Sequence, residues 1–562
     1  MQQLIECVPN FSEGLNLSII KQITDEIERI DGVRLLNVDP GKATNRTVVT
    51  FVGTPDRVIE AAFQAISKAA ELIDMSKHKG EHPRMGATDV CPLIPVAGIS
   101  MEETAEYARK LAKRVGEELR IPVYLYESAA LVSGRTNLSE IRAGEYEGFF
   151  KKIHLPEWKP DFGPAVMNAK AGATVIGARD FLIAYNVNLN TTSVRRANSI
   201  AFDVRERGRV LREGDPVTGK IVKDADGNPV HVPGTLKAVK AIGWFIEEYG
   251  VAQISMNLTN IRVTPVHIAF DEVCKKADAR GIRVTGSELV GLIPLQCMLD
   301  AGKYFLEKQQ RSTGVSEAEL IKIAVKSMGL DELGPFEPEK RIIEYMLRDA
   351  GQEKLVQMSL KAFMEETHSE SPAPGGGSIS AYVGALGVAL GGMVANLSSH
   401  KRGWDARWKE FSDVAETAVK LEKELLYLVD EDTRAFNRIM DAFGLPNGSA
   451  EEKTIRKAAI QAATLHAIET PLRVMQLAYD SFDVIEAMAQ KGNPNSVSDA
   501  GVGALCVRTA VMGAWLNVKI NCSGYDDKEY VNRVLADANA LVQQTNAREA
   551  AILEQVNRVI GV

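Results

Sequence analysis

The sequence predicts a mixed α/β half followed by an all-helical half. At 562 residues the chain is too long for a single hydrophobic core, so several domains are expected. Over residues 1–333, short β-branched and aromatic runs alternate with amphipathic helical segments, which is typical of mixed sheets with helices packed on them. Beyond residue 353 the strand-like runs stop and only helical periodicity remains, which predicts a helical bundle.

Residues 1–172 are expected to form the first α/β subdomain. Residues 101–119 place apolar side chains at helical spacing and predict a helix between the last two strands. The predicted strands are the apolar runs at 4–8, 34–38, 47–53, 89–96 and 123–127.

Residues 173–333 are expected to form the second α/β subdomain. A strand over 173–189 opens it, and a helical tail closes it. Between them we expect a helix over 192–207, a hairpin that pairs 236–246 with 251–260, and a helix over 265–280. Residues 208–234 are a polar excursion with a turn signal at Asp226-Gly227, which predicts a surface hairpin or a flap.

A Pro-bearing, charged segment predicts a linker over 334–353, followed by a helical domain over 354–562. A kink is expected near Pro471. The predicted helices span 355–367, 378–399, about 406–443, 451–490, 497–520 and 527–558.

Residues 378–397 run for twenty positions without a charge, which is long enough to span a bilayer. The stretch is rich in Gly, Ala and Ser rather than in Leu, Ile and Phe, so its transfer into lipid would be weak. Gly387 and Gly391 form a pair of small residues that permits close backbone approach. We therefore expect a fully buried helix and no membrane partner.

Composition narrows the class of protein further. The net charge of -8, without a Lys/Arg-rich run, argues against nucleic acid as a partner. The six cysteines include no CxxC pair, so neither a disulfide framework nor a thiolate zinc site is expected. The N-terminus lacks a basic segment followed by an apolar stretch, which predicts a cytoplasmic protein with reduced thiols.

The densest group of reactive side chains lies in KHKGEHPRMGATD, residues 77–89. His78 to His82 match the HxxEH zinc pattern, which requires a helix. Gly80 and Pro83 disfavour a helix there, so we expect no metal. A rigid loop suits a general base, and the alternative is a solvated loop with surface histidines. Asp39 ends a strand nearby, where an aspartate can orient a histidine or merely form a turn.

Asp432 is the informative residue of the helical half. It lies at helical spacing on the apolar face of 421–440, whereas Asp430 and Glu431 are expected to turn away from that face. A carboxylate there should have a displaced pKa, as a general acid/base requires, or it caps a neighbouring helix. Further upstream, the three glycines of 371–380 precede a helix start that could attract an anion or form a tight turn. The apolar face comprises Leu421, Leu425, Leu428, Val429, Phe436, Ile439 and Met440.

Longer strings resemble known families. The formimidoyltransferase family is resembled by CVPNFSEG (7–14), ATNRTVVTFVG (43–53), DMSKHKGEHPRMGATDVCPLIPV (74–96), IPVYLYE (121–127), IRAGEYE (141–147), PDFGP (160–164), SELVGLIPL (287–295) and RIIEYM (341–346). The cyclodeaminase family is resembled by APGGGS (373–378), LVDEDTRAF (428–436) and SDAGVGA (498–504). Their order and combined length resemble the bifunctional enzymes of histidine degradation that join both families in one chain.

The resemblance implies two folate reactions. The first half would move the formimino group from N-formimidoyl-L-glutamate to N5 of tetrahydrofolate, with the folate between two α/β subdomains. The second half would close 5-formimidoyltetrahydrofolate to 5,10-methenyltetrahydrofolate with loss of ammonia. His82 corresponds to the transferase acid/base and Asp432 to the cyclodeaminase carboxylate. The family's folate-contacting stretch corresponds to Gly163, Pro164, Ala165, Val166, Met167, Asn168, Ala169, Lys170, Ala171 and Gly172.

Those ten residues depart from the versions typical of animal proteins, and the excursion at 208–234 is longer than in those proteins.

Tetrahydrofolate, polyglutamylated, is the expected co-substrate. Arg46, Lys79 and Arg84 lie on the two loops concerned and are expected to bind the glutamate carboxylates. The long amphipathic helices suit a homo-oligomer. Two alternatives remain: a glutamate formyltransferase that uses N-formyl-glutamate, and a helical half that serves only assembly.

Overall fold

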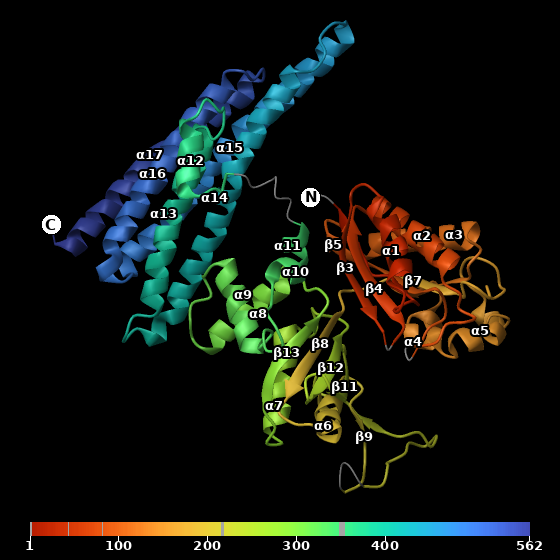
Figure 1. Ribbon diagram of the computed structural model, residues 1–562. Coiled ribbons are helices and arrows are strands. Elements are labelled where there is room, and N and C mark those ends of the chain that lie inside the picture. Colours follow the sequence, from red (N-terminus) through yellow and green to blue (C-terminus); the bar gives the residue numbers. More distant parts are fainter. Residues whose placement is uncertain (1–2, 43, 81–82, 215–218, 348–354, 562) are drawn as a thin grey trace. The chain divides into compact units, whose positions relative to one another are not determined.

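The computed structural model describes residues 3–42, 44–80, 83–214, 219–347 and 355–561. Contacts divide the chain into two compact units. The first, here called the sheet unit, comprises 1–297 and 328–347, and the second, the helical unit, comprises 298–327 and 348–562. The predicted order of an α/β half followed by helices is confirmed (Figure 1).

The first sheet of the sheet unit has seven strands in the order β1-β4-β2-β5-β7-β6, with β3 beside β4. The strands are β1 (Leu4–Cys7), β2 (Asn10–Phe11), β3 (Val33–Gly41), β4 (Arg46–Gly53), β5 (Thr88–Ala97), β6 (Val123–Glu127) and β7 (Thr174–Ala178). Three helices pack against this sheet and against one another in chain order (Figure 1): α1 (Leu17–Glu28), α2 (Pro55–Leu72) and α3 (Met101–Glu118). All five predicted strands and the predicted helix are confirmed.

The strand predicted over 173–189 is two strands in two sheets. β7 pairs in parallel with β5 and β6, whereas β8 (Ile183–Leu189) belongs to the second sheet. The first sheet therefore continues past the expected boundary at 172/173. The charged pair Arg179-Asp180 separates two equally buried apolar runs, and periodicity alone does not tell two such runs from one long strand.

The second sheet is antiparallel, in the order β11-β12-β8-β13, with α6 (Val194–Val204) and α7 (Val266–Asp278) packed against it. The predicted hairpin is confirmed as β11 (Val239–Ile246) paired with β12 (Val251–Leu258). β13 (Val284–Val290) was expected to be part of a helical tail. Its polar residues obscured the strand pattern, since Ser287 Oγ donates a buried hydrogen bond to the carbonyl of Met328.

In its described residues, 208–214 and 219–234, the excursion forms a hairpin, one of the two forms expected. β9 (Arg209–Val210) pairs with β10 (His231–Val232), and Gly227 adopts the positive φ of 82° that the turn requires. The hairpin extends from the end of α6 (Figure 1).

The segment between the halves differs from the linker expected over 334–353. It contains α10 (Pro338–Arg341) and α11 (Ile343–Leu347), which group with the sheet unit, while residues 348–354 lie outside the described part. Residues 298–327, with most of α8 (Leu295–Lys308) and α9 (Glu317–Met328), group instead with the helical unit. The chain therefore passes between the units more than once.

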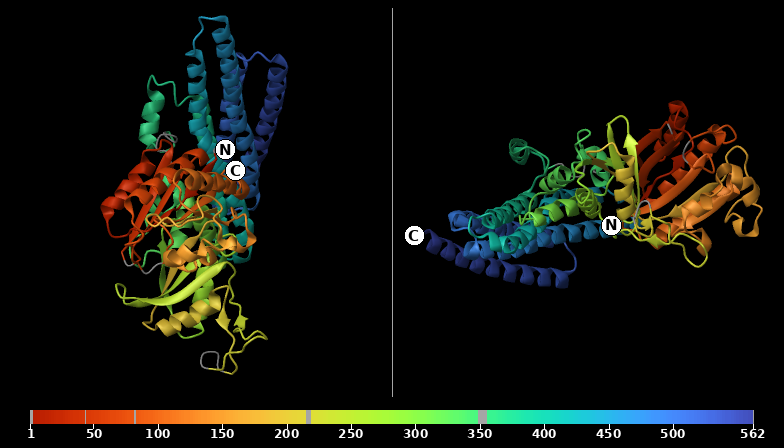
Figure 2. Two further views of the ribbon diagram at one scale, coloured as in Figure 1. Left: turned by 90° about the vertical axis from the view of Figure 1, so that its right-hand side faces the viewer. Right: turned by 90° about the horizontal axis from the view of Figure 1, so that it is seen from below.

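The helical unit confirms the predicted helices. They are α12 (Leu360–His368), α13 (Gly376–Ser399), α14 (Trp408–Phe443), α15 (Ala450–Lys491), α16 (Val497–Cys522) and α17 (Lys528–Ile560). The long ones run side by side (Figures 1 and 2), and α15 continues through Pro471. α13 is central because its glycines permit close approach: a Cβ on Gly387 would lie 2.9 Å from the carbonyl oxygen of Gly503 on α16.

Two helices in the described part of the chain, Gly376–Ser399 and Pro494–Cys522, are long and apolar enough to cross a membrane by length and composition. Within the protein, 61% and 44% of their apolar windows are buried. The full burial expected of α13 is wrong for one face, because Leu386, Met393 and Leu397 are exposed.

Candidate functional site

A cavity of about 470 Å³ lies between the two sheets of the sheet unit. It lies where the resemblance places the folate, between two α/β subdomains. The first sheet and its loops contribute Glu6, Asn10, Asp39, Arg46, Tyr126 and Arg142, and the second sheet contributes Ala184, Lys240, Asn257 and Val290. We call it the intersheet cavity.

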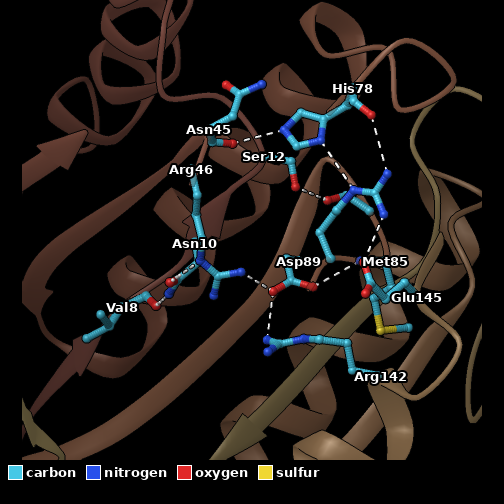
Figure 3. A network of polar contacts seen from close by, with 12 residues as sticks. Val8, Asn10, Ser12, Asn45, Arg46, His78, Met85, Asp89, Arg142 and Glu145 are labelled. Atoms are coloured by element: carbon cyan, nitrogen blue, oxygen red, sulfur yellow. Dashed lines mark hydrogen bonds and ion pairs between the residues drawn. The ribbon is translucent and has the colours of Figure 1, made fainter. Parts of the chain in front are cut away.

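The intersheet cavity holds two arginines that share one buried aspartate (Figure 3). Oδ2 of Asp89, which is inaccessible to solvent, accepts hydrogen bonds from Arg46 and, at 2.7 Å, from Arg142. Its Oδ1 accepts from the backbone N–H of Met85 at 3.1 Å. Arg46 and Arg142 both line the cavity, and guanidinium groups suit a substrate carboxylate.

Arg46 lines the cavity, its predicted contact with a glutamate carboxylate stays a prediction, and Arg142 and Asp89 complete a group that the sequence did not reveal. Burial lowers the pKa of Arg46 from its ordinary value, while Asp89 opposes that shift. Arg46 Nε also donates to Oδ1 of Asn10 at 3.0 Å, which fixes the guanidinium plane. Asp89 is 43 residues from Arg46 and 53 from Arg142 along the chain, so no local pattern joins them.

Glu6 is a second feature of the intersheet cavity that the sequence did not reveal. It lies on β1, is only 3% exposed, and accepts no side-chain hydrogen bond from the described residues. Burial raises the pKa of Glu6 to about 7, although the nearby Arg179 opposes the shift. A carboxyl group that titrates near neutrality in a substrate-sized cavity is a candidate proton carrier. The only signal in the sequence was an acid inside an apolar strand.

The loop 77–89 is not helical at 77–80 or 83–87, in agreement with the prediction. His78 Nε2 contacts the carbonyl of Asn45 at 2.9 Å (Figure 3). Arg84 Nε donates to His78 Nδ1 at 3.4 Å. Glu81 and His82 lie outside the described residues, so the catalytic role of His82 stays a prediction. Among the described residues no group of three or more His, Cys, Asp and Glu side chains is arranged to hold a metal ion.

The two other predicted cations are placed differently from Arg46. Arg84 donates to Glu147 at 2.7 Å and to Glu145 at 3.0 Å, so two carboxylates already compensate its charge. These contacts fix the loop to the start of α5 (Glu145–Lys152), and the substrate contact expected of Arg84 stays a prediction. Lys79 is exposed, and its carbonyl accepts a hydrogen bond from the Asn45 side chain at 2.8 Å.

Asp39 lies exposed on β3 and lines the intersheet cavity, but its carboxylate contacts no histidine in the described part. The stretch Gly163–Gly172 forms the loop before β7, with positive φ angles of 84° and 74° at its two ends. Asn168 Oδ1 accepts hydrogen bonds from the amides of Lys170 and Ala171 and so holds the loop together. None of its ten residues lines the intersheet cavity, so their folate contact stays a prediction.

In the helical unit, Asp432 lies on α14, and its carboxylate contacts the start of α13. Its Oδ2 accepts hydrogen bonds from the backbone N–H of Ser378 at 2.8 Å and from Ser378 Oγ at 3.1 Å. Burial raises the pKa of Asp432, and the hydrogen bonds from Ser378 offset part of that shift. The two sequence hypotheses therefore both describe this residue: it caps a neighbouring helix, and its proton affinity is displaced.

The glycines before α13 make this arrangement possible. A Cβ on Gly377 would collide with the carboxylate of Asp432, and one on Gly376 would lie 3.3 Å from Asn517 Nδ2 on α16. The helix start therefore presents bare backbone next to the carboxyl group of Asp432. The backbone N–H of Ser378 donates to the Asp432 carboxylate, and the binding of an external anion at this helix start stays a prediction.

Asp430 and Glu431, which were expected to turn away from the apolar face that carries Asp432, are buried against other segments of the helical unit. Both are only 6% exposed, whereas Phe436 and Met440, assigned to the buried face, are exposed. Asp430 accepts from the backbone N–H of Leu355 at 2.9 Å, and Glu431 contacts His466 Nε2 at 2.7 Å. These partners lie on distant segments, which the pattern of a single helix does not reveal.

The helical unit also contains a cavity of about 800 Å³, between α13, α14 and residues 314–317. Asp430 and Arg434 line it, but Asp432 does not. Successive helical residues are rotated by about 100°, so Asp430 and Asp432 point to different sides of α14. The large cavity and the Asp432 site are therefore separate features.

Comparison with known families accounts for most of the chain. Residues 4–179 match the model of the formiminotransferase domain, N-terminal subdomain, and residues 184–348 match that of the formiminotransferase domain. Residues 359–540 match the formiminotransferase-cyclodeaminase model. The boundary between the first two matches falls at the break between β7 and β8.

Curated relatives cover the whole chain or one of its halves. Formimidoyltransferase-cyclodeaminase of Gallus gallus is 43% identical over 555 residues, 98% of each chain. Glutamate formimidoyltransferase of Thermoplasma acidophilum is 44% identical and covers 54% of this chain and 92% of its own length. Methenyltetrahydrofolate cyclohydrolase of Methylorubrum extorquens is 34% identical and covers 36% of this chain and 98% of its own length.

Proposed function

This chain belongs to the formiminotransferase-cyclodeaminase family, and we propose that its two units catalyse two successive reactions on one folate. The sheet unit transfers the formimino group from N-formimidoyl-L-glutamate to tetrahydrofolate. The helical unit converts the resulting 5-formimidoyltetrahydrofolate to 5,10-methenyltetrahydrofolate and ammonia. The observation that carries the proposal is the 43% identity to a bifunctional relative over 98% of both chains.

The transfer reaction takes place in the intersheet cavity. N5 of tetrahydrofolate attacks the amidine carbon, the bond from that carbon to the glutamate nitrogen breaks, and a proton moves from N5 to the departing nitrogen. His82, on the loop that ends at Asp89, carries this proton. Arg46 and Arg142, which Asp89 holds in place at the cavity wall, bind the glutamate carboxylates. Lys79 and Asp39 lie on the adjoining segments and assist in binding and in orienting the histidine.

The cyclodeamination takes place at the start of α13. N10 attacks the formimino carbon, and ammonia departs from the tetrahedral intermediate. The leaving nitrogen needs a proton, and Asp432 supplies it because burial keeps the pKa of its carboxyl group above the ordinary value. The contact with Ser378 holds Oδ2 in place and leaves the other carboxylate oxygen available.

The proposal extends to the co-substrate, the metal requirement, the cellular compartment and the oligomeric state. Tetrahydrofolate is a co-substrate, polyglutamylated in the cell, that contacts residues 163–172. Neither reaction requires a metal ion, because proton transfer alone balances both. The enzyme is cytoplasmic and homo-oligomeric, and it assembles through the helical unit, where Leu386, Leu397 and Leu516 are exposed.

The test measures the two reactions separately. The wild-type enzyme should form 5-formimidoyltetrahydrofolate from N-formimidoyl-L-glutamate, and then equal amounts of ammonia and methenyltetrahydrofolate. His82→Ala should lower the transfer rate at least about a hundredfold, as expected for loss of a general base, and leave ammonia release from added 5-formimidoyltetrahydrofolate unchanged. His154→Ala, which alters an exposed histidine, is the matched control and should change neither rate.

Three results would contradict parts of the proposal. Near-normal transfer by folded His82→Ala would make this histidine structural. No ammonia release by the wild-type enzyme would reduce the helical unit to an assembly domain. Faster transfer from N-formyl-glutamate than from N-formimidoyl-L-glutamate would favour the formyltransferase alternative.

A further inference from the structure

A second basic cavity lies in the sheet unit, away from the intersheet cavity. Its volume is about 400 Å³, and it lies between α6 and the first strand of the hairpin at 208–234. Five of the nine residues that line it are arginines, within a chain whose net charge is -8. The lining residues are Arg195, Arg196, Asn198, Ser199, Phe202, Arg205, Arg209, Val210 and Arg212. We call it the arginine cavity.

Two elements build the arginine cavity. Arg195, Ser199 and Phe202 lie at helical spacing on one face of α6, and the chain then turns back into β9. Arg205 follows the end of the helix, and its guanidinium stacks over the ring of Phe202 at 4.0 Å. Arg205 Nε donates to the carbonyl of Gly208 at 2.9 Å, which fixes the guanidinium at the turn.

The positive charge of the arginine cavity is not compensated. Arg209 contacts Asp203, but Arg280 contacts the same carboxylate, so this group also keeps a net positive charge. Arg205 and Arg212 donate only to backbone carbonyl oxygens. Arg195, Arg196, Arg205 and Arg212 have no carboxylate partner within the described ranges of the chain.

Arg195 and Arg196 are exposed and the other three arginines of the cavity are half-buried, and their pattern of contacts differs from that of the more deeply buried arginines of the sheet unit. Arg46, Arg84 and Arg142 each contact at least one carboxylate. In the arginine cavity, like charges face one another, and burial together with the charge of Arg207 lowers the pKa of Arg205. An anion in the cavity would relieve this repulsion, and guanidinium groups can donate pairs of parallel hydrogen bonds to phosphate or carboxylate oxygens.

We propose that the arginine cavity binds a small polyanion that carries two or more adjacent phosphate or carboxylate groups. Four uncompensated guanidinium groups exceed what a single carboxylate needs. The cavity volume accommodates a chain of a few such groups rather than a macromolecule. Because none of its residues lines the intersheet cavity, this binding is separate from that of the glutamate substrate.

Calorimetric titration of the full-length enzyme tests the proposal with two probes, inorganic tripolyphosphate and a pentaglutamate peptide. At least one probe should bind the wild-type enzyme, with an affinity that falls as salt rises. The double variant Arg195→Gln/Arg212→Gln should weaken binding at least about tenfold, because each residue supplies charge-assisted hydrogen bonds. Arg402→Gln, which alters an exposed arginine of the helical unit, should leave the affinity unchanged.

Each outcome has a defined meaning. Binding of tripolyphosphate alone identifies a phosphate ligand, and binding of pentaglutamate alone identifies a polycarboxylate. If neither probe binds, or if the double variant binds as tightly as the wild-type enzyme, the proposal is wrong. It is also wrong if Arg46→Gln abolishes binding, since the probe would then occupy the intersheet cavity. The melting temperature of the sheet unit should be the same in the double variant as in the wild-type enzyme, which shows that this unit is folded.

Discussion

Asp432 shows how one carboxylate serves both stability and chemistry. Its hydrogen bond to the Ser378 amide satisfies a backbone donor at the start of α13, which has no side-chain cap of its own from Gly375. Burial raises the pKa of the same group. The sequence indicated the displaced pKa and the capping role as alternatives, because the periodicity of α14 shows where the side chain points but not what it meets.

We predict that Asp432→Asn separates these two roles. The amide oxygen can still accept from Ser378, so the melting temperature should change little, whereas loss of the proton should lower ammonia release at least about a hundredfold. Asp432→Ala is the companion variant: it removes the cap as well and should cost about 1 kcal/mol of stability. Ammonia assays and thermal unfolding measure both effects. A destabilised Asp432→Asn enzyme with wild-type ammonia release would make the residue purely structural.

Glu6 gives a prediction about stability and pH. Its pKa of about 7 in the folded protein exceeds the ordinary value of 4.5, so the folded state binds the proton more tightly than the unfolded state. The stability contributed by this group is fully present below pH 4.5 and is lost as the pH rises to about 7. Glu6→Gln should therefore stabilise the enzyme at pH 8 by up to about 3 kcal/mol and very little at pH 5.

Denaturant unfolding at both pH values measures this difference. Glu117→Gln on α3, an exposed position, is the matched control and should have a small effect at each pH. An equal effect of Glu6→Gln at pH 5 and pH 8 would show that the Glu6 carboxyl group does not titrate between them.

The sequence around a residue does not reveal which side chains it contacts elsewhere in the chain. The sequence identified Arg46 and Arg84 as cations suited to a substrate, and only Arg46 lines the intersheet cavity. Arg84 meets Glu145 and Glu147 more than sixty residues away, and those contacts make it an anchor for the loop. Residue type and loop position predicted that both arginines could bind a carboxylate. Which of them lines the intersheet cavity and which pairs with glutamates depends on contacts between distant parts of the chain.

At the scale of elements, the start of α13 depends on the absence of a side chain at Gly377. We predict that Gly377→Ala lowers ammonia release strongly, because the new methyl group would displace the carboxylate of Asp432 from Ser378. Gly376→Ala is the matched control, since its methyl group would meet only the side chain of Asn517, at 3.3 Å, and should reduce activity less. Transfer activity should be unchanged in both variants. Equal losses of ammonia release in the two would contradict this role of Gly377.

Helices were easier to predict than strands for a physical reason. α3 and α15 begin at Ser100 and Ser449, each of which forms a capping box with a glutamate three residues later, so sequence and structure agree there within a residue or two. β13 lacks such a local signal, because its hydrogen bonds are made with β8, about a hundred residues earlier in the chain. Strand pairing is non-local, so the pattern of a single segment does not predict it.

At the scale of the whole molecule, the order of the two halves was predicted, but the course of the chain between them was not. Residues 298–327 read as the helical tail of the sheet unit, yet they pack in the helical unit. Thr313 donates its backbone N–H to Ser412 Oγ at 3.0 Å, and Asn396 donates to the carbonyl of Gly314 at 2.8 Å. Gly314 packs directly against Ala415, a contact that only a glycine permits.

This course of the chain determines where the enzyme can be divided. A cut at 334/335, which the composition suggests, removes residues 298–327 from the helical unit and leaves Ser412 and Asn396 without these partners. We predict that fragment 298–562 is more stable than fragment 335–562 by roughly 3 kcal/mol or more, because each lost buried hydrogen bond costs about 1 kcal/mol and the groups left unpaired cost more.

Thermal unfolding compares the two fragments, and light scattering tests assembly on the same samples. Leu386 and Leu397 on α13 and Leu516 and Ile520 on α16 are exposed, so fragment 298–562 should be oligomeric. Equal stability of the two fragments would mean that residues 298–327 contribute nothing to the helical unit. A monomeric fragment 298–562 would show that the exposed leucines of the helical unit do not bind a second copy. Assembly would then be assigned to the sheet unit.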